Sequence, residues 1–435
     1  MKDNNKIKYP KILVISNNVF SETSNNGKTL ASFFTDFPSD NIAQLYFNNE
    51  SPNHDYYNQY FRITDSEMIK SFGSKNHPGK VMKRIKKNDL EIKKDTSGAN
   101  YTSKIKKYNF FRIGRELLWM SKKWQTENLN EWLDKFSPDI IFFCAGDSGF
   151  AYNVTEYIQK KFNSKLVVYI TDDYILPRKT LSPFWGIRRR YIYSKMKKIV
   201  QKSDLYLTIS EEMRKTYKNL FGIDSSLAMN MTESLKQEGN LKEDEGTISL
   251  VYAGGLHFKR YETLNLIAQA IKKYNAEFKE KKAILKIYSG SKLDEKMQNL
   301  LNIPGASEYC GSLNSKELKS VLNQCDIPIH VESFDKKSIE STRLSLSTKI
   351  PEYLSLKKPI LAVGPNKIAS MSYLEDCAFC ITNPENLYEK LKILLNDREL
   401  KNNLSRKALV KYEKKHQKEV ELKLLVDKII NVNKF

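Results

Sequence analysis

The side chains best suited to chemistry are basic residues placed where helices are expected to begin. Ser347 or Thr348 is a good N-cap, and residues 349–356 carry apolar side chains at helical spacing. Free backbone N–H groups at a helix start attract anions, so Lys349 suits a phosphate. Glu352, one turn later, can accept hydrogen bonds from a ribose diol. An ordinary capped helix with a surface lysine and glutamate is the alternative interpretation.

A second basic pair follows two glycines. Residues 247–252 predict a buried strand that runs into Gly254 and Gly255, and Lys259 and Arg260 stand where the next helix would start. Glycine lets the backbone approach a ligand because no Cβ stands in the way. Strand, glycine pair, basic pair and helix together predict a cradle for a diphosphate.

A third candidate follows the first predicted strand, residues 11–16. Gly27, Lys28 and Thr29 invite a P-loop interpretation, which requires another glycine five positions before Gly27. Glu22 occupies that position, so the P-loop is rejected. A loop that borders a ligand and a plain turn both stay open.

Two carboxylates end the predicted strand at residues 166–170. Asp172 and Asp173 directly follow it, and ligands of open α/β sheets lie at the carboxyl ends of strands. A carboxylate there can position an acceptor hydroxyl or take its proton. Capping of the following helix is the alternative role for either aspartate.

Positioning these groups requires strands that alternate with helices, and the apolar runs of the chain follow that order. The chain's 435 residues suffice for two α/β domains of roughly 200 residues each. We expect an N-terminal domain at residues 1–235 and a C-terminal domain at residues 246–415. The polar stretch 233–246, with two glycines and no apolar periodicity, is the expected linker.

The formal net charge of +21 predicts an anionic partner, although lysine and asparagine are abundant along the whole chain. Residues 80–124, within an expected basic insertion at about 66–124, interleave lysines and arginines with large apolar side chains. This pattern fits an interfacial helix on an anionic membrane. A nucleic-acid surface with stacking aromatics, which we do not favour, and an insertion whose aromatics pack on the domain are the alternatives.

Cysteine usage and hydropathy favour a cytoplasmic protein. The five cysteines are odd in number and lie mostly in apolar runs, as reduced core thiols do. Cys377 and Cys380 form a lone C-x2-C pair, so no zinc site is expected. No stretch reaches the length of a transmembrane helix.

One motif resembles a known family. Glu352, six residues, Pro359 and an apolar strand resemble the donor-binding helix of GT-B glycosyltransferases, family 4-like, of bacterial surface-polysaccharide pathways. The family usually has an earlier glutamate in Glu-x7-Glu spacing, and Leu344 stands there in this chain. Glu332 and Glu340 have the spacing, but they belong to the preceding strand and loop and look coincidental.

The resemblance implies a GT-B fold, in which two Rossmann-like domains face an interdomain cleft, with a C-terminal helix at residues 416–435 crossing back to the first domain. It also implies two sets of site residues. The set around the nucleotide-sugar is Gly27, Lys28, Thr29, Gly254, Gly255, Gly290, Gly311, Leu313, Thr348 and Glu352. The catalytic set is Asp172, Asp173, Lys259, Arg260 and Lys349.

The predicted function is transfer of a sugar from a UDP- or GDP-sugar to a glycan or lipid-linked acceptor in surface-polysaccharide (capsule) biosynthesis. The resemblance implies retention of the anomeric configuration. The chain contains no Asp-x-Asp motif, so neither a metal nor another cofactor is expected. We expect a cytoplasmic protein that associates peripherally with the inner membrane face. The alternative is a non-catalytic GT-B-like scaffold that binds membrane or nucleic acid.

Overall fold

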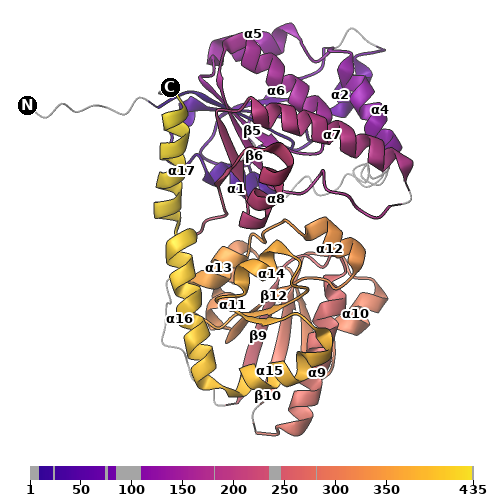
Figure 1. The fold of residues 1–435 in the computed structure, drawn as a ribbon, viewed down its shortest axis with the longest axis vertical. Helices are drawn as coiled ribbons and strands as arrows, with labels where there is room; N and C mark the ends of the chain where they lie inside the picture. The colour runs from indigo at the N-terminus through magenta and orange to yellow at the C-terminus, as the bar shows by residue number, and fades with distance from the viewer. Residues whose placement is uncertain are drawn as a thin grey trace, which may run out of the picture. The chain divides into compact units, whose positions relative to one another are not determined.

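A computed structural model describes residues 9–22, 25–73, 77–84, 109–180, 182–234, 246–280 and 282–433. The chain divides into two compact units (Figure 1). The first, called the N-domain, comprises Met1–Ala228 and Leu422–Phe435. The second, called the C-domain, comprises Met229–Glu421. Each is described by itself below.

The N-domain is built on a sheet whose described strands run in the order β4-β3-β2-β1-β5-β6-β7-β8. All neighbours pair in parallel except β3 and β4. The central strands are buried along their length, as expected for a parallel sheet covered on both faces. The strands are β1 Ile12–Ser16, β2 Ile42–Tyr46, β3 Gln59–Arg62, β4 Lys80–Met82, β5 Ile140–Ala145, β6 Lys165–Ile170, β7 Leu205–Thr208 and β8 Ser226–Leu227.

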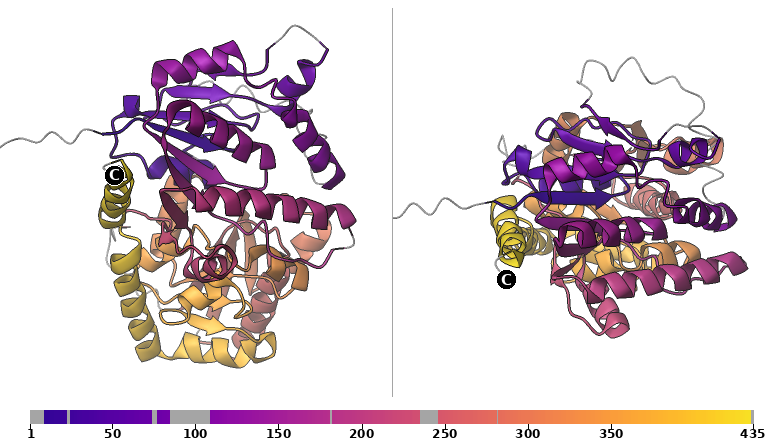
Figure 2. Two further views of the ribbon diagram at one scale, coloured as in Figure 1. Left: turned by 45° about the horizontal axis from the view of Figure 1, so that its top comes forward. Right: turned by 90° about the horizontal axis from the view of Figure 1, so that it is seen from above.

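Side-chain caps fix several helix starts of the N-domain. Thr64 and Glu67 form a capping box at α2, and Ser210 accepts a hydrogen bond from Met213 N at α8. The long magenta helix α7, seen along its length in Figure 2 (left), packs against α6. The described helices are α1 Asn25–Ser32, η1 Ser39–Asn41, α2 Asp65–Lys70, α4 Asn109–Met120, α5 Glu127–Phe136, α6 Gly149–Phe162, α7 Pro183–Gln201 and α8 Glu211–Phe221.

The C-domain is built on a second, wholly parallel sheet in the order β11-β10-β9-β12-β13-β14. Helices flank it on both sides, with α11 and α13 on one side and α9 and α10 on the other (Figure 1). The strands are β9 Thr247–Ala253, β10 Lys282–Tyr288, β11 Ser307–Gly311, β12 Ile327–Val331, β13 Leu361–Val363 and β14 Phe379–Ile381. The helices are α9 Arg260–Glu277, α10 Glu295–Leu301, α11 Ser315–Gln324, α12 Lys336–Thr342, α13 Ile350–Ser355, α14 Ala369–Leu374, η3 Pro384–Asn386, α15 Leu387–Asn396 and α16 Arg398–Lys415.

The chain passes between the units twice, and the two segments are bonded to each other inside the C-domain. The ring of His416, at the end of α16, contacts the carbonyl oxygen of Asn230 at 2.7 Å and the hydroxyl of Tyr373 at 2.8 Å. Burial lowers the pKa of His416 to about 4, so the ring stays neutral at physiological pH. The last helix, α17 Lys418–Val432, then returns to the N-domain. None of the helices in the described ranges is long and apolar enough to cross a bilayer.

Candidate functional site

Loops rich in glycine meet at the carboxyl edge of the C-domain sheet, because parallel strands all end on the same side. The amide of Gly254, after β9, donates to the carbonyl of Tyr288 at 3.1 Å. The amide of Ser289 donates to the carbonyl of Gly311, the last residue of β11, at 2.8 Å. Gly290 follows Ser289 and is exposed. The loops after β9, β10 and β11 therefore form one bonded group.

Two of these glycines occupy positions that other residues would strain. A Cβ built on Gly254 would lie 2.9 Å from the hydroxyl of Tyr252, and that hydroxyl donates to the carbonyl of Gly255 at 2.8 Å. Gly311 has φ +78°, in the left-handed region that favours glycine. Leu313, two residues later, lies half-buried before α11. The predicted glycine loops thus expose backbone at this edge.

Both predicted cations after β9 are paired with carboxylates of the loop that follows β12. Nη2 of Arg260, the first residue of α9, lies 3.1 and 3.0 Å from the two carboxylate oxygens of Glu332. Nζ of Lys259 lies 2.9 Å from Oδ1 of Asp335. These two ion pairs join the loop after β9 to the loop after β12, its neighbour in the sheet.

Glu332 is ionised although its side chain is buried. Burial alone would raise the pKa of this carboxyl, but hydrogen bonding to His330 and the charge and hydrogen bonds of Arg260 hold the pKa below its ordinary value. The hydroxyl of Ser370 also donates to it at 3.3 Å. The edge therefore contains a fixed negative charge whose cationic partner is one of the predicted site residues.

The helix with the resemblance, α13, is tied to the same edge. The hydroxyl of its Tyr353 lies 3.3 Å from both the backbone nitrogen and the carbonyl oxygen of Ala253, the last residue of β9. Nζ of Lys349 lies 3.1 Å from Oε2 of Glu352. The helix begins at Ile350 with Lys349 at its N-cap, so the N-cap predicted at Ser347 or Thr348 is one or two residues too early. The proline in the first turn suits this start, because its fixed φ is that of a helix. The anion-attracting start therefore comes directly after Lys349.

The N-domain places the other predicted residues on two elements. Gly27 lies in α1, where a Cβ would come within 2.2 Å of the carbonyl oxygen of Val19, so the loop after β1 requires a glycine there. Lys28 is exposed and Thr29 is half-buried. A ligand role for these three residues stays a prediction.

The two aspartates after β6 differ in their surroundings. Oδ1 of the buried Asp173 accepts hydrogen bonds from the amides of Ile175 and Leu176 at 3.0 and 2.9 Å. These bonds close a turn rather than cap a helix as the alternative interpretation had it, because the next helix, α7, begins only at Pro183 with Ser182 at its N-cap. Asp172 is half-buried and accepts a hydrogen bond from the hydroxyl of Tyr174 at 3.3 Å. A role of either aspartate toward an acceptor stays a prediction.

An arginine cluster beside β5 was not predicted. Arg112 of α4 and Arg188 of α7 both bond the carboxylate of Asp147, the latter at 2.7 Å. Burial opposes ionisation of Asp147, but the two arginines outweigh it and lower its pKa. Next to them Oε1 of Glu116 accepts from the amide of Gly149 at 2.7 Å, and burial raises the pKa of Glu116 to about 7.

The known proteins that this chain resembles share its fold rather than its sequence. No protein-family model matches the chain, and no curated protein matches it. Among solved structures, Anabaena HepE with UDP-glucose has a TM-score of 0.59 at 10% identity, covering 96% of this chain and 99% of that one. A trehalose-phosphate synthase (UDP-forming) of Burkholderia xenovorans has a TM-score of 0.61 at 8% identity, covering 98% and 100%. The chain has the GT-B fold. The predicted α/β class with two Rossmann-like domains is thereby confirmed.

A glycosyltransferase of Rickettsia africae is similar to the same extent, with a TM-score of 0.58 at 11% identity over 98% of each chain. Identities this low establish a shared GT-B fold alone. In this GT-B chain, sequence reasoning found the glycines and cations at the C-domain edge. It missed Asp335 and set Glu332 aside, although a carboxylate directly after a buried strand was the available signal.

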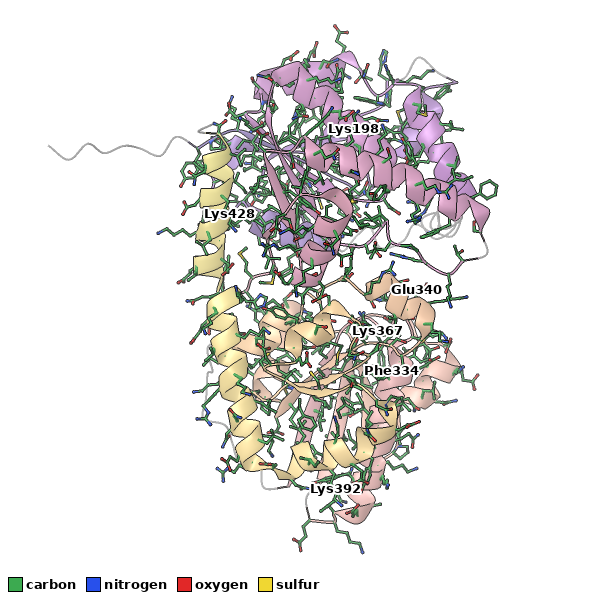
Figure 3. The ribbon with its side chains drawn as sticks, in the orientation of Figure 1. Lys198, Phe334, Glu340, Lys367, Lys392 and Lys428 are labelled. Carbon is green, nitrogen blue, oxygen red and sulfur yellow. The ribbon has the colours of Figure 1, made fainter. Side chains whose placement is uncertain are left out.

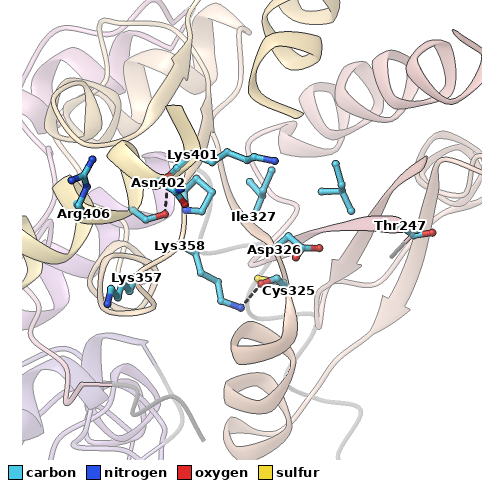
Figure 4. A pocket seen from close by; sticks show the side chains of 13 residues that line it. Thr247, Cys325, Asp326, Ile327, Lys357, Lys358, Lys401, Asn402 and Arg406 are labelled. Atoms are coloured by element: carbon cyan, nitrogen blue, oxygen red, sulfur yellow. Dashed lines mark hydrogen bonds between the residues drawn. The ribbon is translucent and has the colours of Figure 1, made fainter. Parts of the chain in front are cut away.

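No three His, Cys, Asp or Glu side chains gather as a metal-binding group within the ranges that the structure covers. The C-domain does contain a cavity of about 540 Å³ at the opposite, amino edge of its sheet (Figure 4). Thr247, Ile327 and Lys358 line it, and the ammonium of Lys358 donates to the carbonyl of Cys325. The cavity is therefore separate from the glycine loops.

Proposed function

We propose that this GT-B chain is a glycosyltransferase whose donor, a nucleotide-diphosphate sugar, binds at the carboxyl edge of the C-domain sheet. The observation that carries the proposal is the gathering of exposed glycine backbone, Arg260 and the start of α13 with Lys349 at this edge. Such an edge suits a diphosphate, because backbone N–H groups and cations both favour negative charge. The solved structures of similar fold that contain UDP-glucose or UDP support this choice of ligand.

The proposed reaction is retaining and independent of metal. Lys259, Arg260 and Lys349 stabilise the negative charge that grows on the leaving diphosphate, the work a divalent ion does elsewhere. Glu352 accepts hydrogen bonds from the ribose, and Leu313 packs on the base. On the acceptor side, Asp172 positions the attacking hydroxyl of a glycan or lipid-linked acceptor in surface-polysaccharide synthesis. A donor phosphate oxygen takes the acceptor proton.

Thermal shift with UDP, GDP and ADP tests donor binding. A ligand at about 100 times its Kd adds about 2.7 kcal/mol of stability. Lys349→Ala or Glu352→Ala should abolish this gain. Lys392→Ala is the matched control, since Lys392 on α15 also pairs with a glutamate, Glu277, at the far end of α9 from Arg260. Figure 3 shows Lys392 near the bottom of the C-domain and Glu340 of α12 near its top. A chain that gains no stability from any of the three nucleotides contradicts the proposal and favours the scaffold alternative.

We also propose that helices α4 and α7 present the N-domain to an anionic membrane. The apolar residues of the predicted basic segment divide into two groups. Trp119 and Trp124 are 1% and 2% exposed, so these two aromatic side chains pack on the domain. One of the alternatives drawn from the sequence predicted this packing. Leu117 and Met120 on the same helix are 64% and 60% exposed. Because Trp119 and Trp124 are buried, neither can stack on a base, whereas the exposed aliphatic side chains of α4 suit a lipid surface.

Helix α7 extends this surface. It packs beside α4, because Arg112 and Arg188 share Asp147. Phe184 and Ile187 on α7 are exposed as well, and the basic residues Lys179 and Arg190 nearby are exposed too. Exposed apolar side chains together with exposed basic residues suit a membrane, because acyl chains accept the former and anionic headgroups attract the latter.

Co-sedimentation with phosphatidylglycerol vesicles tests the membrane proposal. The double variant Leu117→Asp, Ile187→Asp should lose vesicle binding, since two charges would enter the apolar boundary. The control variant Leu266→Asp, Ile393→Asp changes two exposed apolar residues of the C-domain and should bind as the unaltered chain does. Equal binding of both double variants would refute this surface.

A further inference from the structure

Glu332 lies at the centre of the proposed donor site without being one of its expected ligand contacts. Its side chain is 4% exposed, and both of its oxygens lie against Nη2 of Arg260. The side chain of Arg260 is itself only 16% exposed. The other terminal nitrogen, Nη1, has a longer contact of 3.5 Å with Nε2 of His257. The pair thus occupies one end of the guanidinium.

Four neighbours fix Glu332 in place. Ser370 donates to Oε1 at 3.3 Å, and its hydroxyl lies 3.0 Å from Nε2 of His330. The hydroxyl of Thr263, on α9, donates to the carbonyl oxygen of Glu332 at 2.9 Å. A Cβ on Gly364 would lie 2.7 Å from the Cβ of Glu332, so only glycine leaves it room. Backbone and carboxylate are therefore both held rigidly.

The neighbouring ion pair is different. The side chains of Lys259 and Asp335 are 48% and 23% exposed, so water screens their attraction. Asp335 also caps α12 by accepting from the amide of Ser338 at 3.0 Å. The exposed lysine is therefore held only by a screened ion pair, whereas the buried arginine is held by a carboxylate shielded from water.

We infer that Glu332 is a positioning residue that orients Arg260 toward the donor diphosphate, an inference that rests on the proposed function. A buried guanidinium without its counter-charge would turn toward solvent, because an unpaired buried charge is unfavourable. Glu332 keeps Nη2 occupied and holds the side chain at the start of α9. A phosphate then meets an arginine already in place, and less ordering is needed on binding.

Calorimetric titration with UDP and with uridine tests the inference, because only UDP carries the diphosphate that Arg260 would meet. Glu332→Gln should weaken UDP binding about tenfold and leave uridine binding unchanged. General damage to the fold would weaken both ligands. Asp376→Asn, which removes an exposed carboxylate paired with Lys411 on α16, is the control and should change neither dissociation constant.

The double variant completes the test. If Glu332 acts through Arg260, Glu332→Gln should have no further effect on UDP binding in an Arg260→Ala chain. Should the glutamine variant fail to fold, Glu332→Asp, which withdraws the carboxylate by one methylene, decides by the same comparison of UDP with uridine. UDP binding that is unchanged or tighter in both Glu332 variants overturns the inference. An unaltered chain that binds neither UDP nor GDP instead overturns the proposed function.

Discussion

A buried glutamate lies close to the carboxyl edge of the sheet in each domain, and the pKa values of these two carboxyls are shifted in opposite directions. Burial raises the pKa of Glu116 in the N-domain to about 7, and its Oε2 is buried with no hydrogen-bond partner among the described residues. In the C-domain, the bonds to His330 and Arg260 outweigh burial and lower the pKa of Glu332. Burial alone therefore does not decide the charge. The hydrogen bond to His330 and the arginine bonded to both oxygens decide it together.

The two edges also use their arginines differently. In the N-domain, Arg112 and Arg188 bond one aspartate, Asp147, and neither bonds Glu116 in the described contacts. In the C-domain, Glu332 holds a single arginine at a helix start beside glycine backbone. An edge of the second kind keeps cation and backbone donors together, which is what a diphosphate requires.

The largest effect should come from removing the cation of the C-domain pair. Arg260→Ala leaves Glu332 as an unpaired buried charge, so we expect the C-domain to lose about 3–5 kcal/mol of stability. Urea unfolding followed by a C-domain signal measures this loss. Adding Glu332→Gln to the variant should restore much of it. A loss below about 1 kcal/mol would mean that the pair is not the counter-charge described here.

Removing the charge of the buried N-domain glutamate, Glu116, should stabilise its domain, whereas removing the cation beside Glu332 should destabilise the C-domain. The folded pKa of Glu116, about 7, exceeds the ordinary value of 4.5, so the folded chain holds an extra proton between these values. Its contribution to stability is therefore full below pH 4.5 and falls by about 3 kcal/mol as the pH rises from there through the folded pKa of about 7. Glu116→Gln should remove this fall and stabilise the N-domain at pH 8.

The exposed Glu131→Gln on α5 is the control for that measurement, and it should leave the pH dependence of unfolding unchanged. Unfolding at pH 5 and pH 8 compares the three chains. A Glu116→Gln variant that is less stable than the unaltered chain at pH 8 would show that the Glu116 carboxylate stabilises the N-domain. The proposed difference between Glu116 and Glu332 would then be wrong.

The smallest effect should follow loss of the exposed pair. Asp335→Asn keeps an N-cap for α12 but removes the charge opposite Lys259. Because water screens this pair, the melting temperature should stay nearly unchanged. A drop in melting temperature as large as that of the Arg260→Ala chain would show that the loop after β12 is held mainly by Asp335 rather than by Glu332.

The sequence was informative about elements and much less so about partners. Alternating apolar strands and helices predicted two parallel α/β domains, and Gly254, Arg260 and Lys349 were found because glycine and cations at helix starts are local signals. The pairing of Arg260 with Glu332 spans 72 residues and depends on β9 lying next to β12. The order of strands in the sheet cannot be read from any short stretch of the sequence.

Burial was the other quantity that periodicity could not supply. The spacing of apolar residues in α4 was visible, but which of them face the domain depends on the elements that cover the helix. Trp119 stacks on Phe150, far along the chain, while Leu117 on the next face stays exposed. Likewise, the sequence did not show that Oδ1 of Asp173 accepts from the amides of Ile175 and Leu176 in a turn, because it placed a helix directly after this residue.

The most direct test of the central claim is a crystal structure with UDP bound. We predict both phosphates at the carboxyl edge of the C-domain sheet, with Arg260 still bonded to Glu332 and within hydrogen-bond distance of a phosphate oxygen. UDP bound instead in the cavity at the amino edge, beside Lys358, or Arg260 turned away from the phosphates, would contradict the account.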